Sequence, residues 1–250
     1  MTNKEVMVYS IPRTGSTLIW QCLTKIFPKV LKSHRNRIWD YTAGIRISTE
    51  KHGAVLDYSY PCVITERDLM DSFFSQWRND NWDSEALFYK WLRLASQRET
   101  FDIKKFKETC DAQIPLSSIR KTMVTFRRHL EDLEKVKKEY TGPLLVLQYE
   151  RFWDDYDYIF TKFEEFFDMT ILEEIKTEIK NTTNRNVNKS IQERLKGVDD
   201  HDTETHIHGG HIFLAEPGYS KKVLGEKNLE RIQRLLRCDF EEIMDMDLGE

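Results

Sequence analysis

The start of the chain constrains the fold more than any other part of the sequence. An apolar run at Val6–Ser10 is followed by a short polar loop, and residues 16–27 then place their apolar positions with helical spacing. A buried strand that passes through a tight loop into a helix is the first half of a βαβ unit. Pro28 marks the end of the predicted helix, because proline lacks the backbone donor that a helix needs. The opening therefore predicts an α/β domain.

The rest of the chain continues this alternation. Apolar runs at 30–34, 62–65 and 143–149 predict further strands, and runs with helical spacing at 69–77, 119–140, 158–167 and 228–243 predict helices. Residues 84–140 are expected to be mostly helical, whereas the polar residues 181–222 suggest irregular structure. We expect a single domain over residues 1–250, with a mainly parallel sheet flanked by helices and a helical insertion at about 84–140. Ligands of such sheets bind at the carboxyl ends of the strands.

Composition excludes several other classes of protein. The 250 residues include 38 Lys and Arg against 42 Asp and Glu, so the net charge of −4 argues against a broad nucleic-acid-binding face. The apolar stretches are too short to span a membrane, and the first residues lack the apolar core of a signal peptide. The four cysteines, Cys22, Cys62, Cys110 and Cys238, show no CxxC spacing. We therefore expect reduced thiols in a cytoplasmic protein without a nucleic-acid or membrane partner.

The loop between the first strand and the first helix, Ser10-Ile-Pro-Arg-Thr-Gly-Ser-Thr17, has the features of an anion site. The backbone N–H groups at a helix start bind anions, and Arg13 adds a forked cation that suits phosphate or sulfate. Gly15 lets the backbone come close to a ligand, and Ser16 and Thr17 add hydroxyl donors. In the Walker A pattern, GxxxxGK[ST], Ser10 would stand at the first Gly and Ser16 at the Lys. The alternative is an ordinary helix cap.

The run Pro12-Arg-Thr-Gly-Ser-Thr-Leu18 resembles the 5′-phosphosulfate loop of sulfotransferases that use 3′-phosphoadenylyl sulfate (PAPS). That loop commonly reads P-K-S-G-T-T-W or P-R-S-G-[ST]-T. The resemblance implies the P-loop-like sulfotransferase fold and a catalytic part for Arg13. It also implies that the loop binds PAPS through Arg13, Thr14, Gly15, Ser16 and Thr17.

A second segment resembles the same family. The predicted strand at 62–65 leads into Arg67, and Ser75 follows eight residues later on the next predicted helix. Asp71 stands where the R-x-P-x-D pattern of the family has its Asp, and Leu69 replaces the Pro. The resemblance implies that Arg67 and Ser75 together hold the 3′-phosphate of the cofactor. An arginine with a neutral hydroxyl donor suits the charge of a phosphate.

The third match is the strand at 144–150, which resembles the family's strand ending in Y-E-D-[LM], with Arg151 in place of the Asp. It implies that Tyr149 lies near the adenine. Phe160, Phe163 and Phe167, on the helix that follows, are expected to be core residues.

The candidate general base comes from Leu31-Lys-Ser-His-Arg35, which resembles the family's K-T-H segment. The resemblance implies that His34 takes the proton of the acceptor, since a histidine titrates near neutral pH. Lys32 would assist with charge. Because some carbohydrate-directed members use a glutamate instead, Glu50 and Glu66 are alternative bases.

The late segment His211–Lys222 is similar to the family's H-I-x-x-G-x-x-G-x-W pattern without its first Gly. The similarity implies that Lys221 or Lys222 supplies a cation to the 3′-phosphate. Four histidines gather in this region, and they offer metal binding as an alternative use. They are His201, His206, His208 and His211. No second ligand group has clear spacing, so we expect no metal.

These matches imply a metal-independent sulfotransferase that moves a sulfuryl group from PAPS to a hydroxyl or amine of a small molecule or carbohydrate. Two alternatives stay open. A P-loop-type nucleotide kinase or NTPase would hold Mg²⁺ through Thr17 and Asp57, although the Walker lysine is absent. A non-catalytic relative would bind PAPS without transferring the sulfuryl group. The sequence leaves the acceptor and the oligomeric state open.

Overall fold

The computed structural model describes residues 5–33, 37–40, 45–48, 60–80, 116–196, 200–209 and 216–245. Packing divides the chain into two compact units. The sheet unit comprises residues 1–67, 129–191 and 203–207, and the helical unit comprises residues 68–128, 192–202 and 208–250. The expectation of one domain over residues 1–250 stays a prediction, and residues 84–115 of the expected helical insertion lie outside the described residues.

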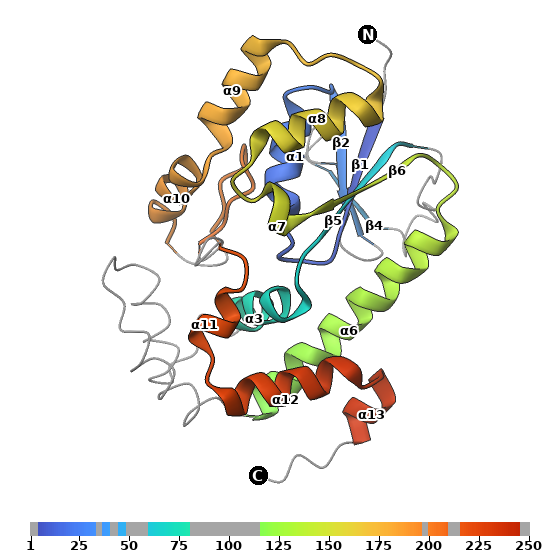
Figure 1. The fold of residues 1–250 in the computed structure, drawn as a ribbon, viewed down its shortest axis with the longest axis vertical. Helices are drawn as coiled ribbons and strands as arrows, with labels where there is room; N and C mark the ends of the chain where they lie inside the picture. Colours follow the sequence, from blue (N-terminus) through green and yellow to red (C-terminus); the bar gives the residue numbers. More distant parts are fainter. Residues whose placement is uncertain are drawn as a thin grey trace. The chain divides into compact units, whose positions relative to one another are not determined.

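The sheet unit is built on a six-stranded sheet with the order β4-β3-β2-β1-β5-β6 (Figure 1). The four strands β2, β1, β5 and β6 are parallel, and β3 and β4 add an antiparallel edge. Their bounds are β1 Glu5–Tyr9, β2 Lys29–Ser33, β3 Arg37–Asp40, β4 Ile45–Ser48, β5 Cys62–Glu66 and β6 Leu144–Gln148. The predicted mainly parallel sheet is confirmed, and the β3–β4 hairpin is an addition that we did not predict.

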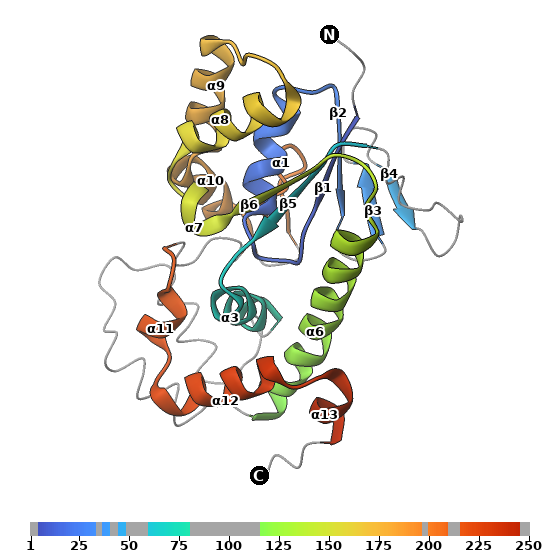
Figure 2. The same ribbon diagram turned by 45° about the vertical axis from the view of Figure 1, so that its right-hand side comes forward.

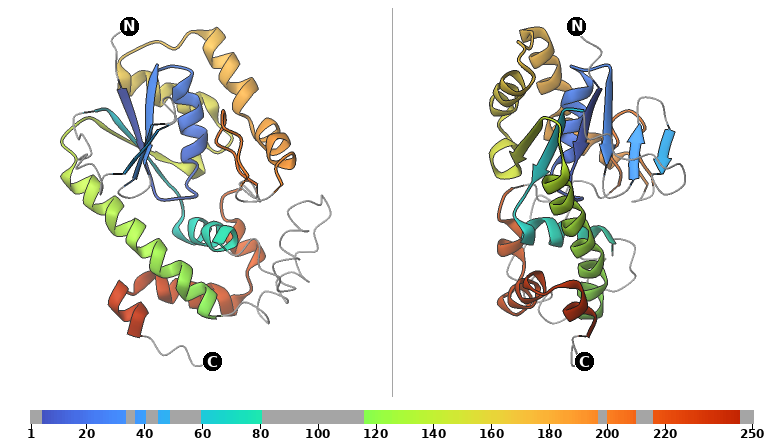
Figure 3. Two further views of the ribbon diagram at one scale, coloured as in Figure 1. Left: turned by 180° about the vertical axis from the view of Figure 1, so that it is seen from behind. Right: turned by 90° about the vertical axis from the view of Figure 1, so that its right-hand side faces the viewer.

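Successive side chains of a strand point to opposite faces of the sheet, and this explains how the helices of this unit pack. Val6 and Val8 of β1 point to the same face, where they join a core made with α1 and α8. Figure 3 shows α1, α8 and α9 gathered beside this face of the sheet. Phe160, Phe163 and Phe167 are buried in that core, as predicted. The helices of the unit are α1 Ser16–Thr24, α7 Tyr149–Phe152, α8 Tyr156–Phe167, α9 Glu173–Thr183, and nearly all of α10 Arg185–Glu193.

The helical unit contains α3 Leu69–Asp80, α11 Tyr219–Val223, α12 Glu226–Arg237 and α13 Phe240–Asp245. Helix α6, Leu116–Glu139, begins in this unit and ends in the sheet unit. Figure 2 shows α11 beside α3, and the two helices are in contact. Phe74 of α3 stacks on Trp77 and meets the ring of Tyr219 on α11.

Two predictions about the late part of the chain are wrong. The single helix expected over 228–243 is two helices, because Asp239 starts a new one: its carboxylate accepts from the N–H of Glu242, and the Glu242 carboxylate accepts from the N–H of Asp239. This reciprocal arrangement is a capping box. Residues 181–222, expected to be irregular, contain all of α10 and most of α11.

No helix in the described part of the chain has both the length and the hydropathy needed to cross a membrane. Cys22, Cys62 and Cys238 are free thiols, and Cys110 lies outside the described residues. Burial raises the pKa of Cys22 and of Cys62 to about 12, so both thiols stay protonated.

Candidate functional site

The anion loop lies in the sheet unit at the carboxyl end of β1 and leads directly into α1. Two of its residues have left-handed backbone: Arg13 at φ 71° and Gly15 at φ 83°. Gly15 is the N-cap of α1 and supplies no side-chain cap, so the N–H groups of the first turn are left for other acceptors. Ser16 and Thr17 are buried in that turn. The loop is therefore arranged as an anion site at a helix start.

Two residues at the end of β5 hold the loop in this conformation. The Thr14 hydroxyl shares a 2.7 Å hydrogen bond with the Thr65 hydroxyl and donates to the carbonyl of Ile11 at 3.0 Å. Arg67 donates from Nη1 to the carbonyl of Arg13 at 3.3 Å. A non-glycine residue in the left-handed region costs free energy and persists only where its surroundings enforce it. The contacts from Thr65 and Arg67 provide that enforcement.

The rings of Tyr149 and Phe152 form an aromatic wall directly behind Gly15. A Cβ atom at this position would lie 2.7 Å from Cδ2 of Tyr149 and 2.8 Å from two ring carbons of Phe152. The two rings meet edge to face, with centroids 5.4 Å apart. Glycine is thus required here for two reasons, its left-handed backbone and the close approach of the rings.

Lys32 brings a cation to the loop from β2. Its ammonium donates to the hydroxyl of Thr17 at 2.7 Å, and the residue is only 4% exposed. Burial, together with the smaller effect of the nearby charge of Arg13, lowers the pKa of Lys32 to about 7. An anion bound beside this ammonium would stabilise its charged form.

Arg67 is buried and lies over the ring of Tyr149, with its guanidinium carbon 4.1 Å from the ring centroid. A cation over an aromatic face is held by the ring quadrupole. Tyr149 itself follows β6, so the site collects residues from the ends of four parallel strands. Such a set of cations, backbone N–H groups and hydroxyls can bind a phosphate or sulfate ester.

In the helical unit, the buried carboxylate of Asp71 organises the late segment. It accepts from the N–H of Gly218 at 2.5 Å, from the N–H of Ser220 at 2.9 Å and from the Ser220 hydroxyl at 2.5 Å. Ser75 is buried on the same helix, α3. Lys221 and Lys222 are exposed, and Lys222 pairs with Glu216 at 2.8 Å. Asp71 is thus the anchor that fixes the segment after Gly218.

No protein-family model and no curated protein sequence matches the chain. Among solved structures, the whole chain is similar to mouse sulfotransferase SULT7A1 in complex with PAP, with a TM-score of 0.52, 10% identity and 88% of that chain covered. The chain has the sulfotransferase fold. Retinol dehydratase in complex with androsterone and inactive cofactor PAP also matches, over all of this chain and 83% of the other, with 12% identity and a TM-score of 0.47. At these identities the likeness concerns the fold.

Within this sulfotransferase fold, the predicted loop residues and Arg67 come together, and Tyr149 lies beside them. Ser75 belongs to the helical unit, and its pairing with Arg67 stays a prediction. The adenine contact of Tyr149 also stays a prediction. The sequence analysis missed Thr65, whose polar side chain directly after the apolar run Cys62–Ile64 was the available signal.

Of the three candidate general bases, the described part of the chain includes one, Glu66. His34 and Glu50 lie outside the described residues, as does Asp57 of the kinase alternative. Glu66 is described: its carboxylate pairs with Lys137 at 2.7 Å and accepts from the Gln148 amide at 2.7 Å. Both contacts hold this carboxylate between α6 and β6.

The histidine cluster is also divided. His206 packs edge-on against Trp20, with ring centroids 4.5 Å apart, while His201 and His208 face each other across an isolated β-bridge. His211 lies outside the described residues. The described part of the chain contains no group of three or more potential metal ligands.

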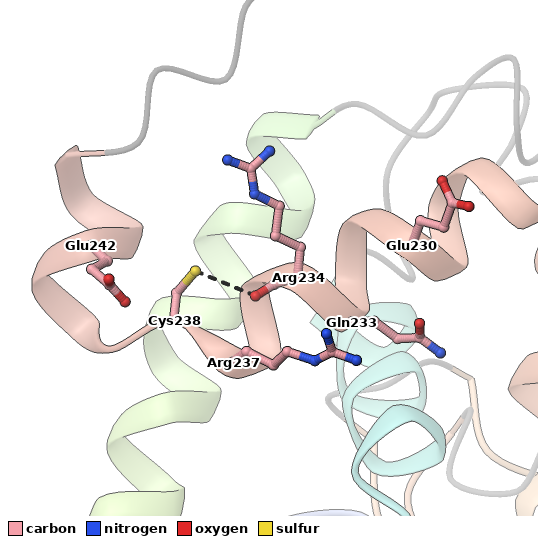
Figure 4. Close-up of a pocket in the computed structure, with 6 residues that line it drawn as sticks. All are labelled: Glu230, Gln233, Arg234, Arg237, Cys238 and Glu242. Atoms are coloured by element: carbon pink, nitrogen blue, oxygen red, sulfur yellow. Dashed lines mark hydrogen bonds between the residues drawn. The ribbon is translucent and has the colours of Figure 1, made fainter.

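An open cavity of about 390 Å³ lies on α12 and α13 (Figure 4). It is lined by Glu230, Gln233, Arg234, Arg237, Cys238 and Glu242. The thiol of Cys238 donates to the carbonyl of Arg234 at 3.3 Å. Because this lining mixes acidic and basic side chains, the cavity does not favour the binding of an anion.

Proposed function

We propose that this chain is a sulfotransferase that transfers a sulfuryl group from PAPS to a hydroxyl or amine of an acceptor. One observation carries the proposal: Arg13, Lys32 and Arg67 come from three strand ends to the start of α1, where the N-cap Gly15 supplies no side-chain cap. The likeness of the fold to a sulfotransferase in complex with PAP supports the choice of donor.

The residues of the loop fit the charge of such a donor. PAPS, when bound, supplies the sulfuryl group and a phosphate leaving group. Arg13 and the N–H groups of the first turn of α1 would neutralise charge on the oxygen that bridges sulfur and phosphorus. Lys32 would place a second cation on the other side of Thr17. Arg67, whose guanidinium lies over the ring of Tyr149, would bind the 3′-phosphate.

The acceptor must lose a proton while its oxygen or nitrogen forms a bond to sulfur and the bond between sulfur and the bridging oxygen breaks. The electron pair of the broken bond stays on the leaving phosphate. We assign the proton to His34, because the segment Leu31–Arg35 resembles the K-T-H segment of the family. A base at that position follows Lys32 by two residues along the chain.

The first test is a calorimetric titration with 3′,5′-adenosine bisphosphate (PAP), the expected product, in EDTA. We expect metal-free binding that weakens about ten- to hundredfold in Arg67→Ala, because a charge-assisted hydrogen bond is lost. Arg151→Ala is the matched control, since Arg151 is exposed and lies over Tyr158. Magnesium-dependent binding of ATP without binding of PAP would overturn the proposal and favour the kinase alternative.

The second test separates catalysis from binding. Transfer from labelled PAPS is followed over a panel of hydroxyl- and amine-bearing acceptors, including phenols and sugars. We expect transfer to at least one class, with the rate reduced about 100- to 1,000-fold in Arg13→Ala because a preorganised donor is lost. Tight binding of PAP without transfer over the whole panel would instead indicate a non-catalytic relative.

A further inference from the structure

Thr65 begins a short chain of hydrogen bonds that ends inside the anion loop. The Thr14 hydroxyl has one hydrogen, which it donates to the carbonyl of Ile11 at 3.0 Å. The 2.7 Å contact between the two threonine hydroxyls must therefore use the hydrogen of Thr65, with the oxygen of Thr14 as the acceptor. Both threonines are fully buried, so water cannot replace either bond.

The register of the sheet explains why Thr65 reaches the loop. β1 is paired with β5 as far as Tyr9 and Ile64. Thr65 lies directly beyond that last pair, where β5 continues along β6 while the chain leaves β1 for the loop. Its side chain is on the same face of the sheet as Val63, which packs in the core with α1. Thr65 thus lies beside the loop, on the face that α1 covers.

Packing alone does not call for a threonine at this position. Valine has nearly the same shape, favours strands and would bury no hydroxyl. Within the described part of the chain, Thr14 is the one hydrogen-bond partner of the Thr65 hydroxyl. The function of this hydroxyl is therefore to be sought in the loop that it contacts.

The hydrogen bonds of Thr14 restrain the backbone at Arg13. Ile11 and Thr14 enclose Arg13, which has a left-handed backbone at φ 71°. This conformation disfavours a residue with a Cβ by a factor of about 5 to 30, and one hydrogen bond contributes a factor of about 2 to 12. Because the two factors are of similar size, the bond from Thr65 weighs in the balance. The bond from Arg67 to the Arg13 carbonyl is the second restraint.

We propose that Thr65 is a positioning residue for the 5′ end of the donor: its hydroxyl holds Thr14, so that Arg13 and the start of α1 are arranged before the ligand binds. This inference rests on the proposed function, in which the loop binds the phosphosulfate. Thr65 is fully buried and acts through the loop. Its loss weakens ligands with a 5′-phosphate and spares ligands without one, because only the former need the preorganised loop.

The test uses three nucleotides that differ only in their phosphates: PAP, adenosine 5′-monophosphate and adenosine 3′-monophosphate. PAP is titrated by calorimetry in EDTA, and the monophosphates are measured by displacement of PAP. Thr65→Val and Thr65→Ala remove the hydroxyl, whereas Thr65→Ser keeps it. Thr122→Val is the control, since Thr122 is a buried threonine of the helical unit whose hydroxyl donates to Asp80 at 3.1 Å. Circular dichroism and urea unfolding confirm that each variant is folded.

For Thr65→Val and Thr65→Ala we expect the affinities for PAP and adenosine 5′-monophosphate to fall about fivefold, the effect of one lost hydrogen bond. Adenosine 3′-monophosphate should bind these variants within about twofold of the wild type. Thr65→Ser should restore the wild-type affinities, and Thr122→Val should match the wild type for all three nucleotides. A threonine that only stabilised the fold would shift the urea midpoint and none of these affinities, because the variant stays folded during the titration.

Wild-type affinity for PAP in folded Thr65→Val would overturn the inference and leave the proposed function standing. An equal loss for all three nucleotides would overturn it too, because the effect would then not be confined to the 5′ end. A loss in Thr65→Ser as large as that in Thr65→Val would do the same. Failure of the proposed function is recognised separately, because the wild-type protein itself would then not bind PAP.

Discussion

Replacing Gly15 by alanine tests the geometry of the loop most directly. The new Cβ would lie 2.7 Å from Tyr149 and 2.8 Å from Phe152, at a backbone φ of 83°. Left-handed backbone costs an alanine about 1–2 kcal/mol, and forcing a methyl group into a packed site costs about 1–3 kcal/mol. We therefore expect Gly15→Ala to lower the free energy of unfolding by about 2–5 kcal/mol.

The chain offers a matched control for this substitution. Gly218 has nearly the same backbone, φ 75°, but no atom of the described residues lies within 4 Å of a Cβ built there. Gly218→Ala should therefore cost only the backbone strain, about 1–2 kcal/mol. Urea unfolding followed by circular dichroism measures both variants, and the difference between them isolates the clash with the rings.

A double-mutant cycle adds a check within the sheet unit. In a Phe152→Leu background the side chain behind Gly15 is smaller, so Gly15→Ala should cost less than it does in the wild type. Equal losses for Gly15→Ala and Gly218→Ala, or no coupling between Gly15 and Phe152, would refute the argument that the aromatic wall requires glycine. A PAP titration of Gly15→Ala then reports whether the loop can shift and still bind.

Three further predictions concern buried polar groups. Thr65→Val removes the hydroxyl that anchors Thr14 and should cost about 1 kcal/mol in urea unfolding, whereas Thr65→Ser should cost less. Asp71→Ala leaves three donors without their acceptor and should lower the free energy of unfolding by about 3–5 kcal/mol. The amide of Ser220 should then exchange its hydrogen faster. Unchanged exchange would contradict the anchoring role of Asp71. Lys32 has a pKa of about 7 when folded and 10.5 ordinarily, so the unfolded chain binds the extra proton between these values. The stability of the wild type relative to Lys32→Met should therefore rise with pH from about 7 to about 10.5, and a flat difference would contradict the burial of the ammonium.

The strands and helices that could be predicted are those with strong local patterns. β1, β5 and β6 are short apolar runs because both faces of a parallel sheet are buried. The β3–β4 hairpin was missed, because each strand has only four residues and only two apolar positions, Ile38 and Trp39 in β3 and Ile45 and Ile47 in β4. The break between α12 and α13 was missed too, because the periodicity continues across Cys238 while the capping box at Asp239 and Glu242 restarts the helix.

The sequence by itself determined the anion loop, because the strand, the glycine and the helix start are consecutive residues whose conformations are local. Only the tertiary structure decided which partners complete it. Lys32 reaches Thr17, and Arg67 reaches both Tyr149 and the carbonyl of Arg13. These contacts exist because β2, β1, β5 and β6 are consecutive parallel strands, which brings distant segments to one edge of the sheet. Burial at that edge then lowers the pKa of Lys32, a property that no pattern of residues along the chain contains.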